Sequence, residues 1–190
     1  MKIYFVTTNK YKFDKFTQAI NIPGIEIEQL AEESPEIQAT NNGQIAEFSA
    51  WSMAQKYNVP VLKEDIGMYI HALRGFPGPY LNQIEKWIET DGFLQLLRDK
   101  KDRSAHWEYA ISFCAPGETA KTFITNPKGA IAFEAKGKSG WFADKIFIPD
   151  KQNKTISELL GEKKYIRDED HYRQMKKFLI GKFVKASPKS

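Results

Sequence analysis

Two adjacent carboxylates, Glu64 and Asp65, are the side chains of this sequence best suited to chemistry. They follow the apolar run Val61-Leu62-Lys63, and a loop of turn-forming residues, Gly75-Phe76-Pro77-Gly78-Pro79-Tyr80, comes soon after. Carboxylates at the carboxyl end of a buried strand are suitable ligands for a divalent cation. Single acids at such a position are also often helix caps or hydrogen-bond acceptors of a loop.

The start of the chain has the composition of a phosphate-binding loop. An apolar segment, residues 3–6, is followed by Thr7, Thr8, Asn9 and, three residues later, Lys12. Small polar residues and a lysine between a strand and a helix can hold a phosphate group. Thr8 or Asn9 could equally well serve only to cap the helix. A phosphate loop and a cation site in one chain together indicate an enzyme that acts on nucleotides.

Two later segments add candidate groups. Glu36 lies in Ser34-Pro35-Glu36-Ile37-Gln38 and, taken alone, is an exposed acid of a loop. Trp141-Phe142-Ala143-Asp144 follows a glycine-rich break, and an aromatic side chain beside an acid can stack on a base and bind its edge. Equally well, the tryptophan of this second segment could pack against the protein as a buried apolar side chain, with Asp144 as an acid of a turn.

Apolar periodicity predicts the elements that must position these groups. We expect strands at residues 2–7, 25–30, 59–63, 69–73, 106–115, 119–125 and 129–136, and helices at 9–20, 41–57, 80–87, 92–98, 155–160 and 168–183. Thr155 and Glu158 have the spacing of a capping box at the start of the helix at 155–160. Because helices and strands alternate, the fold class is α/β with a mixed sheet. We expect one domain over residues 1–185 and a tail over residues 186–190.

Composition limits the setting of the protein. The chain has 190 residues, of which 42% are hydrophobic, and this is enough for a packed core. No apolar run is long enough to span a membrane, and we expect no signal peptide. The single cysteine, Cys114, lies in a strand-like segment, so we expect it to be buried and the protein to be cytoplasmic.

Charge is uneven along the chain. The net charge is +4, and the last thirty residues alone carry +5. A basic segment can bind nucleic acid, but one solvated helix face is the simpler explanation, so a nucleic-acid partner is the least favoured possibility.

The order of the motifs resembles that of the Ham1 family of inosine/xanthosine triphosphate pyrophosphatases. The resemblance runs from about Thr7 to Phe178. It is carried by Thr7-Thr8-Asn9-Lys10-Tyr11-Lys12, Ser34-Pro35-Glu36-Ile37-Gln38, Val61-Leu62-Lys63-Glu64-Asp65, Gly75-Phe76-Pro77-Gly78-Pro79-Tyr80, Gly92-Phe93-Leu94-Gln95-Leu96-Leu97, the segment 140–147 and Glu162-Lys163.

This resemblance implies a fold, an activity and a set of site residues. The fold is an ITPase-like, elongated mixed β-sheet with flanking helices, in two lobes around a central nucleotide cleft, and the protein is a homodimer. The activity is the Mg²⁺-dependent release of pyrophosphate from noncanonical purine nucleoside triphosphates. The implied metal ligands are Glu36 and Asp65, the catalytic residues are Asp65, Glu64 and Lys12, and the substrate-binding residues are Thr7, Thr8, Asn9, Lys12, Trp141, Phe142, Asp144, Lys163, His171 and Arg173.

The sequence departs from the family in the motifs that bind the base. The S-H-R motif near the C-terminus is absent, and His171 with Tyr172 or Arg173 stands in its neighbourhood. Trp141 and Ala143 replace a phenylalanine and an aromatic residue of the family. The departures predict a pyrophosphatase with an altered base preference. A nucleotide-binding protein that has lost turnover is the alternative.

Overall fold

The structure is a computed structural model, and it describes residues 1–184. The strands are β1 (Lys2–Val6), β2 (Glu26–Leu30), β3 (Val61–Ile70), β4 (Pro77–Gly78), β5 (Ser104–Cys114), β6 (Lys121–Thr125), β7 (Lys128–Ile131) and β8 (Phe147–Pro149). The α-helices are α1 (Lys10–Ala19), α2 (Asn42–Tyr57), α3 (Leu81–Leu96), α4 (Ile156–Gly161) and α5 (Asp170–Phe183), and the 3₁₀ helices are η1 (His71–Leu73) and η2 (Phe142–Lys145). The expected tail at residues 186–190 lies outside the described residues.

The strands form one mixed sheet in the order β2-β1-β3-β5-β7-β8, with β4 paired to β3 and β6 paired to β5. β1 pairs in parallel with both β2 and β3, whereas β5 pairs antiparallel with β6 and β7. The predicted α/β class with a mixed sheet is therefore confirmed. Among the described residues, no helix is both long enough and apolar enough to cross a membrane.

The chain divides into two compact units. Within the described residues, the first unit comprises residues 1–65, 109–125 and 169–184, and the second comprises residues 66–108 and 126–168. Each unit is therefore assembled from segments that are far apart in the sequence. Several of the candidate groups of the opening loop, β3 and α5 are brought into the first unit in this way.

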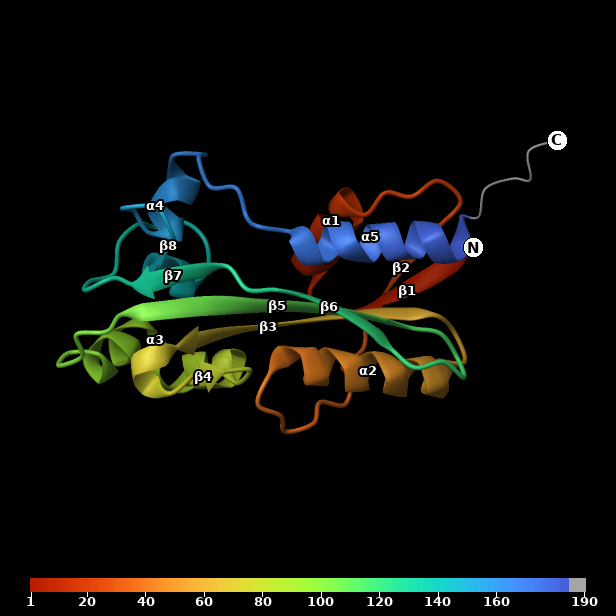
Figure 1. Cartoon of the computed structure of the whole chain (residues 1–190), viewed down its shortest axis with the longest axis horizontal. Helices are drawn as coiled ribbons and strands as arrows, with labels where there is room; N and C mark the ends of the chain where they lie inside the picture. The colour runs from red at the N-terminus through yellow and green to blue at the C-terminus, as the bar shows by residue number, and fades with distance from the viewer. Residues whose placement is uncertain (185–190) are drawn as a thin grey trace. The chain divides into compact units, whose positions relative to one another are not determined.

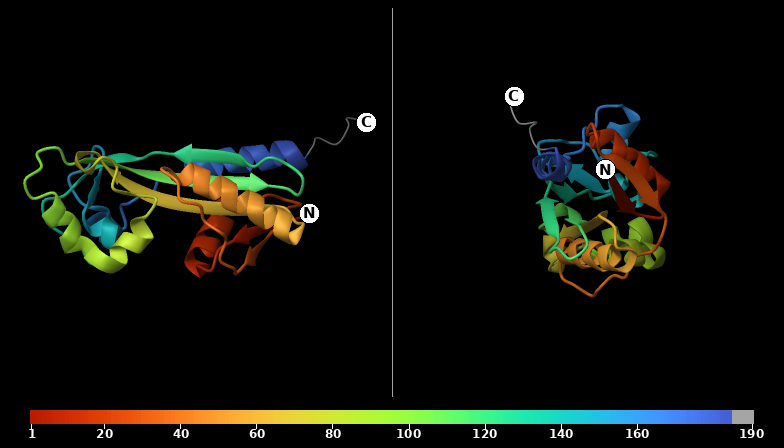
Figure 2. Two further views of the ribbon diagram at one scale, coloured as in Figure 1. Left: turned by 90° about the horizontal axis from the view of Figure 1, so that it is seen from below. Right: turned by 90° about the vertical axis from the view of Figure 1, so that its right-hand side faces the viewer.

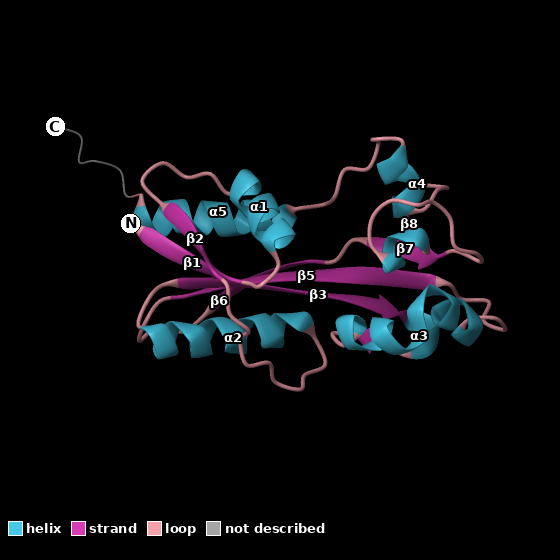
Figure 3. Ribbon diagram, turned by 180° about the vertical axis from the view of Figure 1, so that it is seen from behind, coloured by secondary structure: helices cyan, strands magenta, loops and turns pink. Residues whose placement is uncertain are grey.

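The strands of the first unit carry a helix layer on each face (Figures 1 and 3). Side chains of a strand alternate between its two faces. Leu62 packs in the apolar cluster with Phe16 of α1 and Met175 of α5, whereas its neighbour Val61 packs in the cluster with Met53 of α2. Burial of these two apolar clusters fixes the register of β3, because a slip of one residue would exchange the faces.

The α2 layer approaches the strands closely. A Cβ atom at Gly43 would lie only 2.7 Å from Cδ1 of Ile124 in β6, so glycine permits this approach at the start of the helix. Asn41 caps α2 by accepting a hydrogen bond from the backbone N–H of Gln44. Cys114 is fully buried in the cluster on this face, as predicted.

In the second unit, α3 lies on one side of β3 and β5, and α4 lies on the other side (Figures 1 and 2). The two helices predicted at 80–87 and 92–98 are one element with a kink, because Glu89 has φ 47° and ψ −165°. The capping box predicted at Thr155 and Glu158 begins α4.

The largest error of the sequence prediction concerns β3. The prediction gave a strand at 59–63, with the acids after its carboxyl end, and a second strand at 69–73, but one strand runs from Val61 to Ile70. Glu64 and Asp65 therefore lie within a strand and not at its end. The prediction failed because paired acids and Gly67 resemble a turn, whereas pairing with β1 at Leu62 and with β4 at Met68 keeps the backbone extended.

Candidate active site

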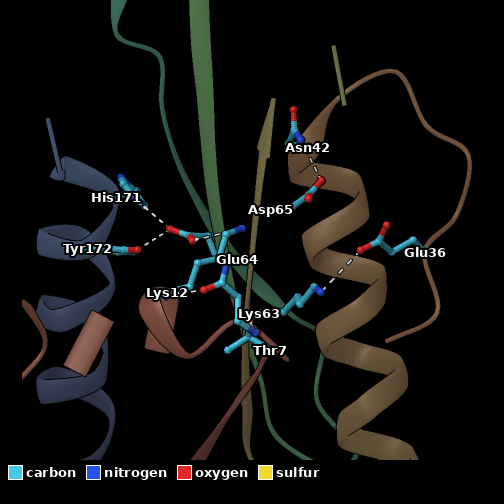
Figure 4. A network of polar contacts seen from close by, with 10 residues as sticks. Thr7, Lys12, Glu36, Asn42, Lys63, Glu64, Asp65, His171 and Tyr172 are labelled. Atoms are coloured by element: carbon cyan, nitrogen blue, oxygen red, sulfur yellow. Dashed lines mark hydrogen bonds and ion pairs between the residues drawn. The ribbon is translucent and has the colours of Figure 1, made fainter. Parts of the chain in front are cut away.

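Glu64 and Asp65 point to opposite faces of β3 (Figure 4). The side chain of Glu64 lies on the same face of β3 as Leu62, which faces α1 and α5. The side chain of Asp65 lies on the same face as Val61, which faces α2. The carboxylates of these two adjacent residues therefore lie in two different environments.

Glu64 is buried, and groups from two helices hold its carboxylate. The Tyr172 hydroxyl donates a hydrogen bond to Oε1, and Nε2 of His171 lies 3.6 Å from the same oxygen. Nζ of Lys12 lies 3.7 Å from Oε2. Burial acts to raise the pKa of Glu64, but the His171 hydrogen bond, the Lys12 charge and the Tyr172 hydroxyl outweigh it and lower this pKa to about 2. Glu64 is therefore ionised at neutral pH, with its oxygens facing groups of the protein.

Asp65 has a less favourable environment for its charge. Nδ2 of the fully buried Asn42 donates a hydrogen bond of 2.8 Å to Oδ2 of Asp65. Burial raises the pKa of Asp65 to about 6, and the nearby charge of Glu36 adds to this rise, whereas Asn42 and the charge of Lys12 oppose it. The ionised carboxylate of Asp65 is thus under-compensated by the groups of the protein.

Glu36 lies in the exposed loop before α2, as predicted. Its Oε1 is 3.6 Å from Nζ of Lys63, a side chain of β3 in the same row as Asp65. Glu36 is close enough for its charge to act on Asp65. Among the described residues, no three His, Cys, Asp or Glu side chains gather in a group that could hold a metal ion.

The opening loop is ordered by its own polar groups. Oγ1 of Thr7 accepts the backbone N–H of Asn9 at 3.1 Å, and Oδ1 of Asn9 accepts the backbone N–H of Lys12 at 3.1 Å. Asn9 is therefore the N-cap of α1, which confirms the capping interpretation. The cap places the Lys12 side chain on the first turn of α1, where it meets Glu64. Thr8 is exposed.

The candidate residues of the second unit also make internal contacts. The indole N–H of Trp141 donates to Oε2 of Glu85 at 2.8 Å, and its backbone N–H donates to Oδ2 of Asp144 at 2.7 Å. Asp144 is buried and caps η2, and Phe142 stacks on Phe93 with a centroid distance of 5.7 Å. Trp141 is partly exposed.

The remaining candidates differ in exposure. Lys163 is exposed and has a positive φ of 58° just after α4. Arg173 is exposed on α5 and pairs with Asp170 at 3.2 Å. His171 is 1% exposed and is therefore not a solvated residue of the helix surface. Its ring stacks on Tyr109 at 5.5 Å, and its Nδ1 has no hydrogen-bond partner within the described part of the chain.

Sequence reasoning missed four residues that shape these contacts. They are Asn42, Lys63, Tyr172 as a partner of Glu64, and Glu85. Asn42 directly follows the capping residue of α2, and an asparagine at the start of a helix is typical of a cap. The alternation of β3 could have revealed Lys63 as a neighbour of Asp65, had the strand been predicted at its full length.

Comparisons with known proteins show the family to which this chain belongs. A model of the Ham1 family matches residues 3–169. A dITP/XTP pyrophosphatase of Methanopyrus kandleri is 37% identical over 164 residues, which cover 86% of this chain and 87% of that protein. A dITP/XTP pyrophosphatase of Methanosarcina mazei is 38% identical over 163 residues, 86% of this chain and 88% of that protein. The solved Ham1 protein of Staphylococcus aureus has a TM-score of 0.82 at 24% identity and covers 96% of this chain and 100% of that one. The chain belongs to the Ham1 family.

Proposed function

We propose that this protein is a nucleoside triphosphate pyrophosphatase that converts a noncanonical or modified purine nucleotide to its monophosphate and pyrophosphate. The relatives at 37% and 38% identity are dITP/XTP pyrophosphatases. The observation that carries the proposal is the pairing of Lys12, on the first turn of α1, with the buried and ionised Glu64. This pairing holds an ammonium group beside the loop of Thr7, Thr8 and Asn9.

Lys12 and the loop supply the groups for the triphosphate. An ammonium group attracts phosphate oxygens, and the hydroxyl and amide groups of the loop can donate hydrogen bonds to them. Glu64 limits the motion of Lys12 without neutralising it fully, because their closest atoms are 3.7 Å apart. We assign phosphate binding to Thr8, Asn9 and Lys12, with Lys163 as an additional cation.

The chemistry of the acids fits Mg²⁺. Mg²⁺ binds through one or two carboxylates together with substrate phosphates and water, so a larger protein cluster is not required. Asp65 presents a buried carboxylate whose charge the protein leaves under-compensated, and Glu36 is a second oxygen ligand whose charge acts on it. A bound Mg²⁺ would offset the charge of the phosphates and favour departure of pyrophosphate.

In the reaction, water attacks the α-phosphorus, and the bond from this phosphorus to the oxygen that bridges to the β-phosphate breaks. One proton of the water passes to a protein base, and the bridging oxygen leaves with pyrophosphate. Asp65 is the better candidate for this base, because the oxygens of Glu64 already face Tyr172, His171 and Lys12.

We further propose an altered base preference. The family's S-H-R motif is absent, and the histidine nearest its position, His171, faces Glu64. In the base-binding loop of the family, Asp144 is kept, whereas Trp141 and Phe142 differ from the family pattern. We expect these three side chains to contact the base. A site that loses its hydrogen-bond partners for one base loses its selectivity for that base.

The decisive experiment is a panel of canonical, deaminated and modified nucleoside triphosphates assayed for pyrophosphate release with and without Mg²⁺. We expect release from at least one purine triphosphate only with Mg²⁺, and loss of release in Asp65→Asn. Strong preference for ITP and XTP would contradict the altered preference. Binding of nucleotides without any pyrophosphate release would instead support a non-catalytic nucleotide-binding protein.

The homodimer implied by the family and the cytoplasmic location expected from the single cysteine stay predictions. Light scattering of the purified protein after size exclusion measures its mass, and a monomer mass at micromolar concentration would contradict the dimer.

A further inference from the structure

The second unit contains a pair of histidines that the proposed activity does not use. His71 begins η1, and His106 lies in β5. Nε2 of His71 and Nδ1 of His106 are 3.0 Å apart. The whole chain has three histidines, and the third, His171, is 1% exposed. Imidazole chemistry at the surface of this protein is therefore confined to His71 and His106.

A chain of hydrogen bonds determines which nitrogen carries the proton in each neutral ring. The hydroxyl of Ser104 donates to Oδ1 of Asp102 at 2.6 Å and so has no second proton to donate. Ser104 must then accept from Nδ1 of His71, which lies 2.8 Å from its oxygen. Neutral His71 consequently has its lone pair on Nε2, and Nδ1 of His106 supplies the proton between the rings. This tautomer follows from the network of donors and acceptors.

We propose that His71 and His106 form a two-histidine chelating site for a divalent transition-metal ion, which binds Nε2 of His71 and Nδ1 of His106. The proton that Nδ1 of His106 loses is taken up by Nε2 of the same ring, so both imidazoles stay neutral. Metal–imidazole nitrogen bonds are about 2.0–2.1 Å long, so nitrogens 3.0 Å apart subtend about 90–100° at one ion. This angle fits adjacent positions of a square-planar or tetragonal centre, the geometry of Cu²⁺ and Ni²⁺. Regular tetrahedral Zn²⁺ would require a separation of about 3.3 Å.

The surroundings prepare both ligands for this role. A metal-bound histidine usually donates its other ring N–H to an acceptor that fixes its orientation. His71 has this arrangement through Ser104 and Asp102. The ring of His106 stacks on Tyr69 with a centroid distance of 5.0 Å and an angle of 8°, which limits its rotation.

The charges near the pair act in opposite directions. Asp102 is close enough to interact with His71, and its carboxylate favours a bound cation. Lys128, which is paired with His106 in the β5–β7 register, opposes it. In the described chain no third His, Cys, Asp or Glu joins the pair, so water or an external ligand would complete the coordination.

The test uses the full-length protein without an affinity tag. Cu²⁺ is titrated calorimetrically in excess Mg²⁺, which occupies hard oxygen ligands, and the electron paramagnetic resonance spectrum reports the bound atoms. We expect one Cu²⁺ per chain, a spectrum with two nitrogen ligands, and affinity in the order Cu²⁺ above Ni²⁺ above Co²⁺. His71→Gln and His106→Gln should each weaken Cu²⁺ binding more than tenfold, and the double variant should abolish this site.

Two surface variants serve as matched controls. Ser104→Ala leaves both ligands but removes the acceptor that orients His71, so it should weaken binding by about tenfold. Lys128→Gln removes a repelling charge and should tighten binding. Thermal melts confirm that each variant folds. Cu²⁺ binding that is unchanged in the double variant, a spectrum with oxygen ligands alone, or no binding by the wild type would each overturn the proposal.

Discussion

Replacement of Asp65 by asparagine should make the metal-free protein more stable and less active. Asp65 is 9% exposed, and burial raises its pKa to about 6 from an ordinary value of 3.8. Its ionised form is therefore less favourable in the folded chain than in the unfolded chain. Asparagine has nearly the same shape, keeps an oxygen that can accept the N–H of Asn42, and carries no charge.

The size of the effect follows from linkage between protonation and folding. A pKa that is about two units higher in the folded state lowers the free energy of unfolding by about 3 kcal/mol at pH 7.5. Below pH 3.8 the carboxyl is protonated in both states, and the loss disappears. Stability is lost as the pH rises from 3.8 to 6 and stays at the lower level above this range. At pH 5 the loss is about half of its full value.

Denaturant unfolding in EDTA at pH 5 and pH 7.5 measures this difference. Asp65→Asn should unfold at higher denaturant concentration than the wild type, with a gain of about 3 kcal/mol at pH 7.5 and about half of that at pH 5. Added Mg²⁺ should stabilise the wild type but not the variant, because the variant lacks the charged ligand. A variant that is less stable than the wild type at pH 7.5 in EDTA would refute the reasoning.

Three further predictions concern the groups around this site and the loop before η2. Tyr172→Phe removes a donor to the buried charge of Glu64 and should lower the free energy of unfolding by about 1.5–3 kcal/mol, measured with urea. Gly140 has φ +81°, and the Cβ atom of Gly140→Ala would clash with Oδ2 of Asp144. Gly117 has a similar φ of +74°, but the Cβ atom of Gly117→Ala would meet nothing within 4 Å. Gly140→Ala should therefore lower the melting temperature clearly more than Gly117→Ala, and equal melting temperatures would contradict the clash. Lys12→Gln should raise KM for the nucleotide at least tenfold, and an unchanged KM would exclude phosphate binding by Lys12.

Local signals of the sequence were enough to predict most elements. The small polar residues after the first strand predicted the cap of α1 at Asn9, and Thr155 with Glu158 predicted the start of α4. The spacing of apolar residues predicted α2 and α5, because each helix buries one face against the strands. These features depend on interactions within a few residues, which a single sequence displays directly.

Features that depend on pairing between distant segments could not be predicted. β3 continues through Gly67 because β4 pairs with Met68 and Tyr69. The position of Tyr172 beside Glu64 results from packing of α5 against the strands, with 108 residues between the two partners. A single sequence contains no record of such a contact, and the family resemblance assigned only individual residues.

The separation of Glu64 from Asp65 shows how one strand can supply both an anchor and a reactive group. The two residues are neighbours in sequence, but alternation along β3 turns them to opposite faces. On one face, Tyr172, His171 and Lys12 compensate the charge of Glu64, and on the other face Asp65 accepts a hydrogen bond from Asn42. A compensated charge stabilises the fold, whereas an under-compensated charge is available to bind a cation or to accept a proton. Because the two roles need opposite environments, an exchange of the two side chains, Glu64→Asp with Asp65→Glu, would keep the net charge and yet impair both.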